Sequence, residues 1–283
     1  MDRSNSPYKR SLRVFARDWK NLASLGFVLL LVALALFSRF VVTCDPDHQN
    51  INKITQSPNL QHYFGTDSLG RDLYSRVIYG SRISMLVAFI TAAAGLILGS
   101  LYGTVAALGG KQIDTALMRL LDFAYCLPTL LLLILLNMLF GQGLVGIVAA
   151  ISLEGMCTVA RLVRGQVLQL KQMDFVLASL ALGSSRSSLF CRHLLPNLIP
   201  PLIVTLTFLI PSNIMYEAFL SFIGLGIQPP YSSWGTLANE GWRGMLSHPH
   251  LILFPGTAIF VTMLAFHFLG DGIRVAFDPQ SER

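Results

Sequence analysis

Apolar residues along this chain are gathered into long uninterrupted runs, with polar residues confined to the segments between them. A membrane-spanning helix needs about 20 predominantly apolar residues, and six runs of about that length or longer are present. The pattern predicts an all-α integral membrane protein with six transmembrane helices. The predicted spans are 22–42, 83–108, 116–140, 144–163, 198–223 and 251–277.

The composition agrees with this prediction. Of the 283 residues, 53% are hydrophobic and only 13% are charged, whereas a soluble domain carries charge on about a quarter of its residues. Gly and Pro recur inside the spans, where neighbouring helices can satisfy the backbone groups that they leave free. In the second span, Gly95 and Gly99 are small enough to favour close contact with another helix.

The N-terminal tail is basic, and a basic segment directly before a first span stays in the cytoplasm. Six spans then place both termini and the polar segment 164–197 in the cytoplasm, and residues 43–82 and 224–250 outside. The cations of the tail are Arg3, Lys9, Arg10, Arg13, Arg17 and Lys20.

These spans divide the chain into five parts. In the outer loop, we interpret Leu69–Ser81 as an amphipathic segment at the membrane interface, where Asp72 and Arg76 have the i,i+4 spacing of a helical ion pair. The parts are a cytoplasmic basic tail (1–21), a first transmembrane helix (22–43), an outer loop (44–82), a five-helix core that includes the loop 164–197 (83–279), and a cytoplasmic tail (280–283).

The sequence carries no pattern for catalysis or nucleotide binding. It lacks G-x-S-x-G, H-E-x-x-H and the Walker A pattern G-x-x-x-x-G-K-[ST]. His248 and His250 are the only close histidine pair, and no further Cys or His stands beside them at metal-ligand spacing. We expect no enzyme activity, no cofactor in this chain and no metal site.

Charged residues inside spans are costly and are candidates for function. Glu154 lies midway along the fourth span, and Glu217 lies near the outer end of the fifth. Each can face a water-filled passage as a pathway or gating residue, or bond to a neighbouring helix. Arg119 and Asp122, spaced i,i+3 near the end of the third span, are expected to pair with each other.

The polar segment 174–197 reads as a helical hairpin. Asp174 suits the start of a helix through Leu182, and Gly183 supplies the left-handed residue that ends it. Ser184 or Ser185 can cap a second helix.

That second helix is expected to run to about Leu194, and Pro196 suits the first turn of the fifth span. The hairpin is a surface to which another protein binds or, alternatively, a connecting turn without a partner.

This hairpin resembles the cytoplasmic coupling loop, Glu-Ala-Ala…Gly, of the permease subunits of binding-protein-dependent ABC importers. Ala178 and Gly183 match that pattern, Ser179 replaces the second Ala, and Leu177 stands where many members have Glu. In that family the loop docks into a cleft of the ATP-hydrolysing subunit. With Leu177 at the Glu position, docking is expected to rest on shape and small residues. The implied docking residues are Asp174, Leu177, Ala178, Ser179, Gly183 and Arg186.

Three further segments narrow the subfamily. Phe64–Arg76 resembles the outer-loop signature of the dipeptide/oligopeptide and nickel permeases, and Glu217–Gly235 and Leu269–Pro279 resemble two more of its signatures in the same order. His267 departs from the Asn expected in the last of these. The resemblance covers about 64–279.

The resemblance implies a multi-pass permease of the bacterial cytoplasmic (inner) membrane that forms half of a pathway by alternating access. The implied partners are a second homologous permease subunit, two ATPase subunits that bind the ATP, an extracytoplasmic substrate-binding protein and membrane lipid. Trp234 can contact the binding protein or anchor at the membrane interface. The net charge of +6 reflects the basic inner face, not nucleic-acid binding. The candidate contacts for the binding protein are Asp67, Arg71, Asp72 and Trp234.

Peptides are the expected substrate, and nickel or another small solute is the alternative. A stand-alone secondary transporter or channel would predict an internal repeat with paired broken helices, and no clear repeat is visible. A membrane-embedded enzyme would need a convergent polar site, which the sequence does not reveal.

Overall fold

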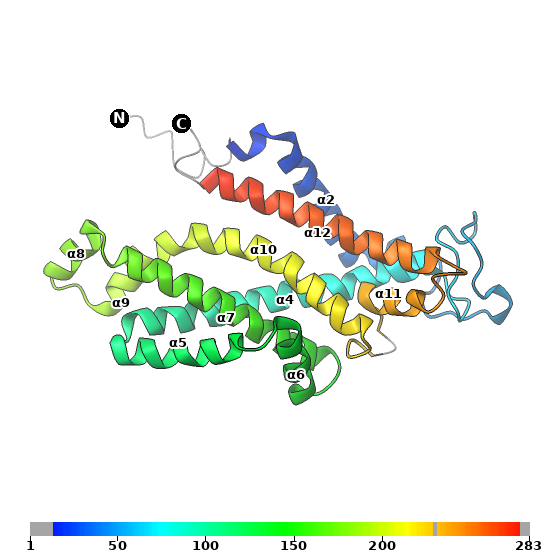
Figure 1. Cartoon of the computed structure of the whole chain (residues 1–283). Coiled ribbons are helices and arrows are strands. Elements are labelled where there is room, and N and C mark those ends of the chain that lie inside the picture. The colour runs from blue at the N-terminus through cyan, green and yellow to red at the C-terminus, as the bar shows by residue number, and fades with distance from the viewer. Residues whose placement is uncertain (1–13, 229–230, 278–283) are drawn as a thin grey trace.

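The computed structural model describes residues 14–228 and 231–277, and most of this part of the chain is helical (Figure 1). The described residues form no strand, only an isolated bridge between Thr66 and Asp72. The predicted all-α class is therefore confirmed. The named elements are α2 (Trp19–Leu36), α3 (Ser38–Val41), the 3-10 helix η1 (Ile51–Lys53), α4 (Leu73–Leu108), α5 (Lys111–Tyr125), α6 (Thr129–Phe140), α7 (Leu144–Leu170), α8 (Asp174–Ala181), α9 (Arg186–Leu189), the π-helix η2 (Phe190–Leu194), α10 (Leu195–Phe222), α11 (Trp234–Trp242) and α12 (His250–Phe277).

Within the described ranges, five helices are long and apolar enough to cross a membrane: α2, α4, α7, the combined helix Phe190–Phe222, and α12. A sixth crossing exists if α5 and α6 count as one span, but these two helices are bent by 99°. The prediction of one continuous helix over 116–140 is therefore wrong. Pro128 explains the break, because it has no N–H to donate and disfavours helical backbone at Leu127.

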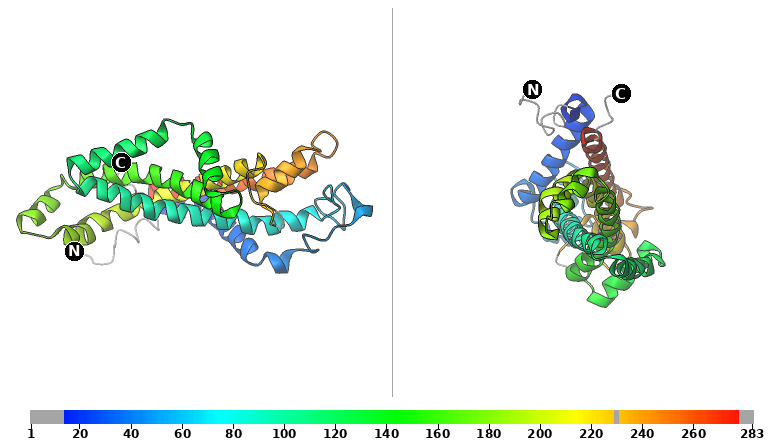
Figure 2. Two further views of the ribbon diagram at one scale, coloured as in Figure 1. Left: turned by 90° about the horizontal axis from the view of Figure 1, so that it is seen from below. Right: turned by 90° about the vertical axis from the view of Figure 1, so that its left-hand side faces the viewer.

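The long helices lie side by side in an elongated bundle (Figures 1 and 2). The central helix is α4, which contacts α2, α5, α7, α10 and α11, while α2 and α12 pair along one side. At one end of the bundle lie α8 and α9, and at the opposite end lie α11 and the loop that precedes α4 (Figure 1). The candidate functional segments are thus separated by the full length of the bundle.

Glycines hold α4 and α7 close together. A Cβ at Gly95 would lie 3.1 Å from the carbonyl carbon of Gly155, and one at Gly99 would lie 2.6 Å from the Cβ of Val159. A Cβ at Gly103, one turn further on, would collide with the carbonyl oxygen of Ala160. The predicted role of Gly95 and Gly99 in close helix contact is confirmed.

The start of α4 differs from the predicted interfacial segment. Asp72 caps the helix by accepting a hydrogen bond from the Ser75 amide at 2.8 Å, so Leu73 onward belongs to one helix of 36 residues. At 1.5 Å per residue this helix is about 54 Å long, which exceeds the roughly 30 Å of a hydrocarbon core. Leu69–Ser81 is therefore not a separate element, because residues 73–81 belong to the same helix as the span.

The second helix of the hairpin also differs from its prediction, because it does not end near Leu194. α9 continues through η2 into α10 without a break. In a regular α-helix the ring of Pro196 would clash with the carbonyl of Arg192, four residues earlier. The wider π turn lies just before that proline, so the chain stays helical from Arg186 to Phe222.

Candidate functional sites at the two ends of the bundle and along one face

The α8–α9 hairpin (residues 174–194) turns at Gly183. This glycine has φ +79°, the left-handed conformation that glycine adopts at little cost, as the sequence predicts. The Ser185 hydroxyl accepts a hydrogen bond from the Ser188 amide at 3.3 Å, which caps the following helix. A Cβ at Gly183 would meet none of the described atoms within 4 Å. The turn therefore needs glycine for its backbone and not for space.

The hairpin packs around a small interior and leaves apolar side chains outside. Val176 is fully buried and belongs to the main apolar core, as do Leu189 and Leu194. Ser179 is also buried, and its hydroxyl donates to the Ser184 hydroxyl at 2.8 Å across the turn. Ser179 is therefore a structural residue of the hairpin and not part of its exposed surface.

The exposed surface of the hairpin includes most of the other predicted docking residues. Asp174, Leu177, Ala178 and Gly183 are exposed, and Leu182 has 88% of its surface exposed. The side chain of Arg186 lies outside the described part of the structure. The tip of the hairpin therefore carries exposed apolar side chains, Leu177 and Leu182.

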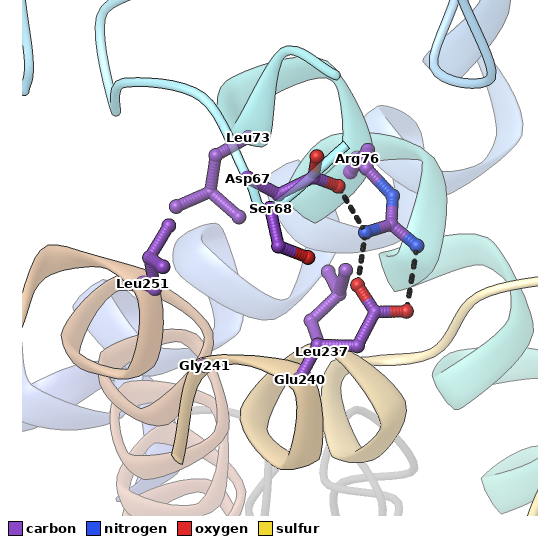
Figure 3. A pocket seen from close by; sticks show the side chains of 8 residues that line it. All are labelled: Asp67, Ser68, Leu73, Arg76, Leu237, Glu240, Gly241 and Leu251. Atoms are coloured by element: carbon purple, nitrogen blue, oxygen red, sulfur yellow. Dashed lines mark hydrogen bonds and ion pairs between the residues drawn. The ribbon is translucent and has the colours of Figure 1, made fainter. Parts of the chain in front are cut away.

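At the opposite end, four charged residues form the α11 cluster: Asp67, Arg71, Arg76 and Glu240. Arg76 donates to Asp67 at 2.7 Å and to Glu240 at 2.5 Å (Figure 3). Arg71 donates to the same two carboxylates at 2.6 and 3.0 Å. The cluster joins the loop before α4 and the first turn of α4 to α11.

Asp72 and Trp234 are buried beside this cluster. Asp72 contacts the His62 ring at 2.9 Å in addition to capping α4, so the predicted Asp72–Arg76 pair does not form. The Trp234 indole N–H donates to the Val77 carbonyl at 3.0 Å. Only 1% of Trp234 is exposed.

The four residues predicted to contact a binding protein are largely enclosed in this structure. Asp67, Asp72 and Trp234 are buried by their own chain, and Arg71 is mostly covered. Their partners include Glu240, which the sequence analysis did not single out. The helix that carries Glu240 was missed too: Ser233 and Thr236 form a capping box at its start, but Thr236 stands where the sequence signature of such a box has Glu or Gln.

Glu217 is fully buried between helices. Its carboxylate accepts hydrogen bonds from the Ser84 hydroxyl of α4 at 3.1 Å and from the Ser221 hydroxyl at 2.7 Å. Ser84 also accepts from the Trp234 amide at 3.2 Å. Of the two alternatives for Glu217, this arrangement fits bonding to a neighbouring helix.

Glu154 lies in a different setting, on a partly exposed face of α7. Its carboxylate accepts a hydrogen bond from Thr158 at 3.4 Å, and Glu154 helps to line a small hollow at the bend between α5 and α6. Nearby, Asp122 pairs with Arg161 of α7 at 2.9 Å. The predicted Arg119–Asp122 pair is therefore wrong, because Arg161 on the adjacent helix provides the cation instead.

No group of three or more His, Cys, Asp or Glu side chains that could hold a metal ion occurs within residues 14–228 and 231–277. Many of the described polar residues instead join helices through hydrogen bonds or are exposed on the bundle. The geometry is that of a helical membrane protein with a protruding hairpin, without a convergent catalytic group among the described residues.

Relatives of known function share nearly the whole chain. The chain is 36% identical over 278 residues to the oligopeptide transport system permease protein OppC of Bacillus subtilis (strain 168), covering 98% of this chain and 91% of that protein. It is 40% identical to the dipeptide transport system permease protein DppC of the same strain, covering 100% of this chain and 91% of that protein. It is 37% identical to the glutathione transport system permease protein GsiD of Salmonella typhimurium (strain LT2), covering 99% of this chain and 92% of that protein.

Solved structures and a family profile agree with these relatives. An inward-facing MetNI methionine ABC transporter matches with a TM-score of 0.60 at 17% identity, covering 73% of this chain and 98% of that chain; at that identity the match bears on the fold. The profile described as "binding-protein-dependent transport system inner membrane component" matches residues 93–283. The chain therefore belongs to this family, as the sequence motifs predict: it is a multi-pass inner-membrane permease of an ABC importer and not an enzyme.

Proposed function

We propose that this permease forms half of the translocation pathway for di- or oligopeptides and that its α8–α9 hairpin docks onto an ATPase subunit. The relatives named above transport dipeptides, oligopeptides and glutathione, which is itself a tripeptide. The observation that carries the docking role is the exposed hairpin, which extends from one end of the bundle with Leu177 and Leu182 uncovered. The family description supports a binding protein as a further partner.

The assembly that fits this role holds four further subunits. A second homologous permease completes the pathway, two ATPase subunits bind and hydrolyse the ATP beneath the membrane, and an extracytoplasmic binding protein delivers the peptide. Each partner can drive the cycle if it binds two conformations of the bundle with different affinity. Alternating access follows when ATP binding favours one of those conformations.

The continuous helix after Gly183 offers a route for coupling. A force on the hairpin reaches α10 directly, because α9, η2 and α10 form one helical segment. The π turn is the point where that segment departs from regular helix, and such turns frequently mark functional positions. We expect the hairpin and α10 to move together when the ATPase subunits close.

We expect the hairpin to contact the ATPase subunit mainly through apolar side chains. Leu177 occupies the place of the family's Glu and is half exposed, and the nearby Leu182 adds a second uncovered apolar side chain. Burial of such side chains contributes about 1.5–3 kcal/mol each. The part of the docking that these two leucines provide should vary little with salt, because it uses no exposed ion pair.

The pathway role fits Glu154 better than Glu217. Glu154 is partly exposed beside the helix break, whereas Glu217 is enclosed by serines of its own chain. We therefore assign Glu154 to the pathway and give Glu217 a role in joining α4 to α10.

The experiment that tests docking is substitution of Gly183 in the assembled transporter. Gly183→Val forces a β-branched residue into a left-handed turn and should abolish peptide uptake and uptake-coupled ATP hydrolysis, with normal membrane insertion. Gly183→Asn should retain much of both, because Asn tolerates this conformation. The matched control is Gly256→Val in α12, where a Cβ also meets none of the described atoms within 4 Å.

Two results would contradict the proposal. One is a tagged wild-type protein that never brings down an ATPase subunit from membranes of its own cell. The other is unchanged peptide uptake in Gly183→Val at normal abundance.

A further inference from the structure

A line of polar side chains runs along the neighbouring faces of α5 and α7. Thr158 donates to Glu154 at 3.4 Å, and the Tyr125 hydroxyl lies 3.3 Å from the Thr158 hydroxyl. The Arg161 guanidinium lies 4.2 Å above the Tyr125 ring and pairs with Asp122 at 2.9 Å. These five residues are called the polar face below. Glu154, Thr158 and Arg161 share one side of α7, because their spacings of four and three residues are helical.

This polar face is exposed although α7 is long and apolar enough to cross a membrane and α5 belongs to the bent pair that can form a further crossing. The side chain of Arg161 is 50% exposed and that of Asp122 is 66% exposed. Charged side chains within spans almost always face a bundle interior or a water-filled cavity, because exposure to lipid is costly. The polar face is therefore directed away from lipid in the assembled transporter.

The broken helix supplies a second, independent argument. Residues 126–128, between α5 and α6, are not helical, and non-helical backbone at membrane depth is tolerated only inside protein or along a water-filled cavity. The hollow at this bend is lined by Tyr125, Leu127, Thr129 and Glu154, among others. The break and the charged side chains thus point to the same aqueous surface.

The charges on this surface have opposite signs at a defined separation. Glu154 and Arg161 are seven residues apart on one helix, which corresponds to about 10 Å along its axis. An extended peptide of three residues spans at most about 10 Å. A zwitterionic tripeptide therefore matches this face in both charge and length, with the Tyr125 and Thr158 hydroxyls available to its backbone between the ends.

We infer that the polar face is a transient binding site for the peptide in transit, with Glu154 facing its ammonium group and Arg161 its carboxylate. This inference rests on the proposed peptide-import function. Asp122 is a positioning residue, because it holds one side of the Arg161 guanidinium and leaves other N–H groups exposed. In the predicted orientation, α7 starts outside, so the peptide travels with its carboxylate towards the hairpin end.

The first experiment measures uptake and ATP hydrolysis by the complete transporter in proteoliposomes with its binding protein and a tripeptide. Glu154→Gln and Arg161→Gln should each reduce uptake about tenfold, the effect of losing a hydrogen bond to a charged group. Stimulation of ATP hydrolysis by the loaded binding protein should persist within about twofold. Asp271→Asn and Arg82→Gln are the matched controls, because both side chains are exposed and lie off the polar face; neither should change uptake.

Three results would overturn the inference: normal uptake in both variants, loss of stimulated ATP hydrolysis together with uptake, or loss of the second permease from the purified complex. The last would show that the face is a subunit interface. Absence of ATPase coupling in the wild type would instead contradict the proposed function and leave the next measurement valid.

The second experiment tests exposure to water without transport. Thr158→Cys, in a background with Ser at Cys44, Cys126, Cys157 and Cys191, should react with a charged, membrane-impermeant thiol reagent in the assembled transporter, and the tripeptide should slow that reaction. Ile97→Cys, at a 59% exposed apolar position on α4, should react far more slowly. Equal protection of both positions would place Thr158 against lipid or protein and refute the inference.

Discussion

The two ends of this bundle differ in which side chains they bury and which they expose. At the α11 end, charged residues lie inside: Arg76 and Asp67 are 4% and 5% exposed and bind each other. At the hairpin end, apolar residues lie outside, with Leu182 exposed for 88% of its surface. At the α11 end the charged side chains therefore pair within the chain, whereas at the hairpin end apolar side chains remain exposed and available to a partner.

This difference suggests which end moves as a rigid unit. The α11 cluster joins segments that are 164 residues apart in sequence, from Arg76 to Glu240. The hairpin contacts the rest of the bundle mainly through its own continuation into α10. Regions with few buried contacts open at lower free energy, so we expect the hairpin to adapt to the ATPase while the α11 end keeps its shape.

The largest effect is expected from Arg76→Met. The substitution leaves the buried Asp67 carboxylate with Arg71 as its remaining ion-pair partner and removes both bonds from Arg76 to Glu240. Loss of one partner costs about 3–5 kcal/mol when the other buried charge is left unpaired, and the remaining pairs of Arg71 with Asp67 and Glu240 reduce that cost here. The thermal midpoint of the purified transporter should fall clearly, together with its yield in membranes.

Arg82→Met is the control for this prediction. It removes an exposed guanidinium from the same helix, two turns further on, with no ion-pair partner among the described residues. Its midpoint should stay near that of the wild type. Equal losses in the two variants would show that the α11 cluster does not stabilise the protein.

The second-largest loss of stability is expected at the contact between α4 and α7. Gly99→Ala would place a methyl group 2.6 Å from the Val159 Cβ and 2.7 Å from the Met156 carbonyl oxygen. Overpacking of this kind costs about 1–3 kcal/mol. Gly155→Ala, across the same interface, meets Gly95 at 3.6 Å, an ordinary contact. A larger loss of thermal midpoint for Gly99→Ala than for Gly155→Ala would support this geometry, and the reverse order would refute it.

Sequence reasoning succeeded where the signal is local. Spans appear as runs of apolar residues, and the hairpin turn appears as Gly183 between two short helices, so both could be predicted from neighbouring residues. The bend at residues 126–128 was missed because Pro128 inside an apolar run was treated as a tolerated proline. The apolar character of a run shows that it can lie in a membrane, but not whether its helix is straight or bent.

The α11 cluster could not be predicted, because its partners are distant in sequence. Glu240 meets Arg71 and Arg76 only after the chain has crossed the bundle and returned. Trp234 was interpreted as a surface aromatic residue, which is a reasonable interpretation for a tryptophan in a loop between spans. Its burial depends on α11 packing against α4 and α12, and a nine-residue helix gives only a weak periodic signal.

A smaller effect is expected at the buried carboxylate of Glu217. Ser84→Ala removes one hydroxyl donor from Glu217 and the acceptor of the Trp234 amide, which should cost about 1–2 kcal/mol. Ser100→Ala is the matched control on α4, because the Ser100 hydroxyl is buried without a hydrogen-bond partner in the described structure. If Ser100→Ala lowers the thermal midpoint as much as Ser84→Ala does, the hydrogen bonds to Glu217 do not hold α4 and α10 together.

The smallest effect on stability, with a large effect on function, is expected at the hairpin tip. Leu182→Asp exchanges an exposed apolar side chain for a charge, and such surface changes usually alter stability by less than about 0.5 kcal/mol. The thermal midpoint of the separated permease pair should therefore be unchanged. Binding to the ATPase subunits should nevertheless weaken, because the carboxylate must lose its hydration where Leu182 would have been covered. Co-purification of ATPase with tagged permease measures this directly, and full ATPase recovery with Leu182→Asp would show that the apolar tip stays uncovered in the transporter.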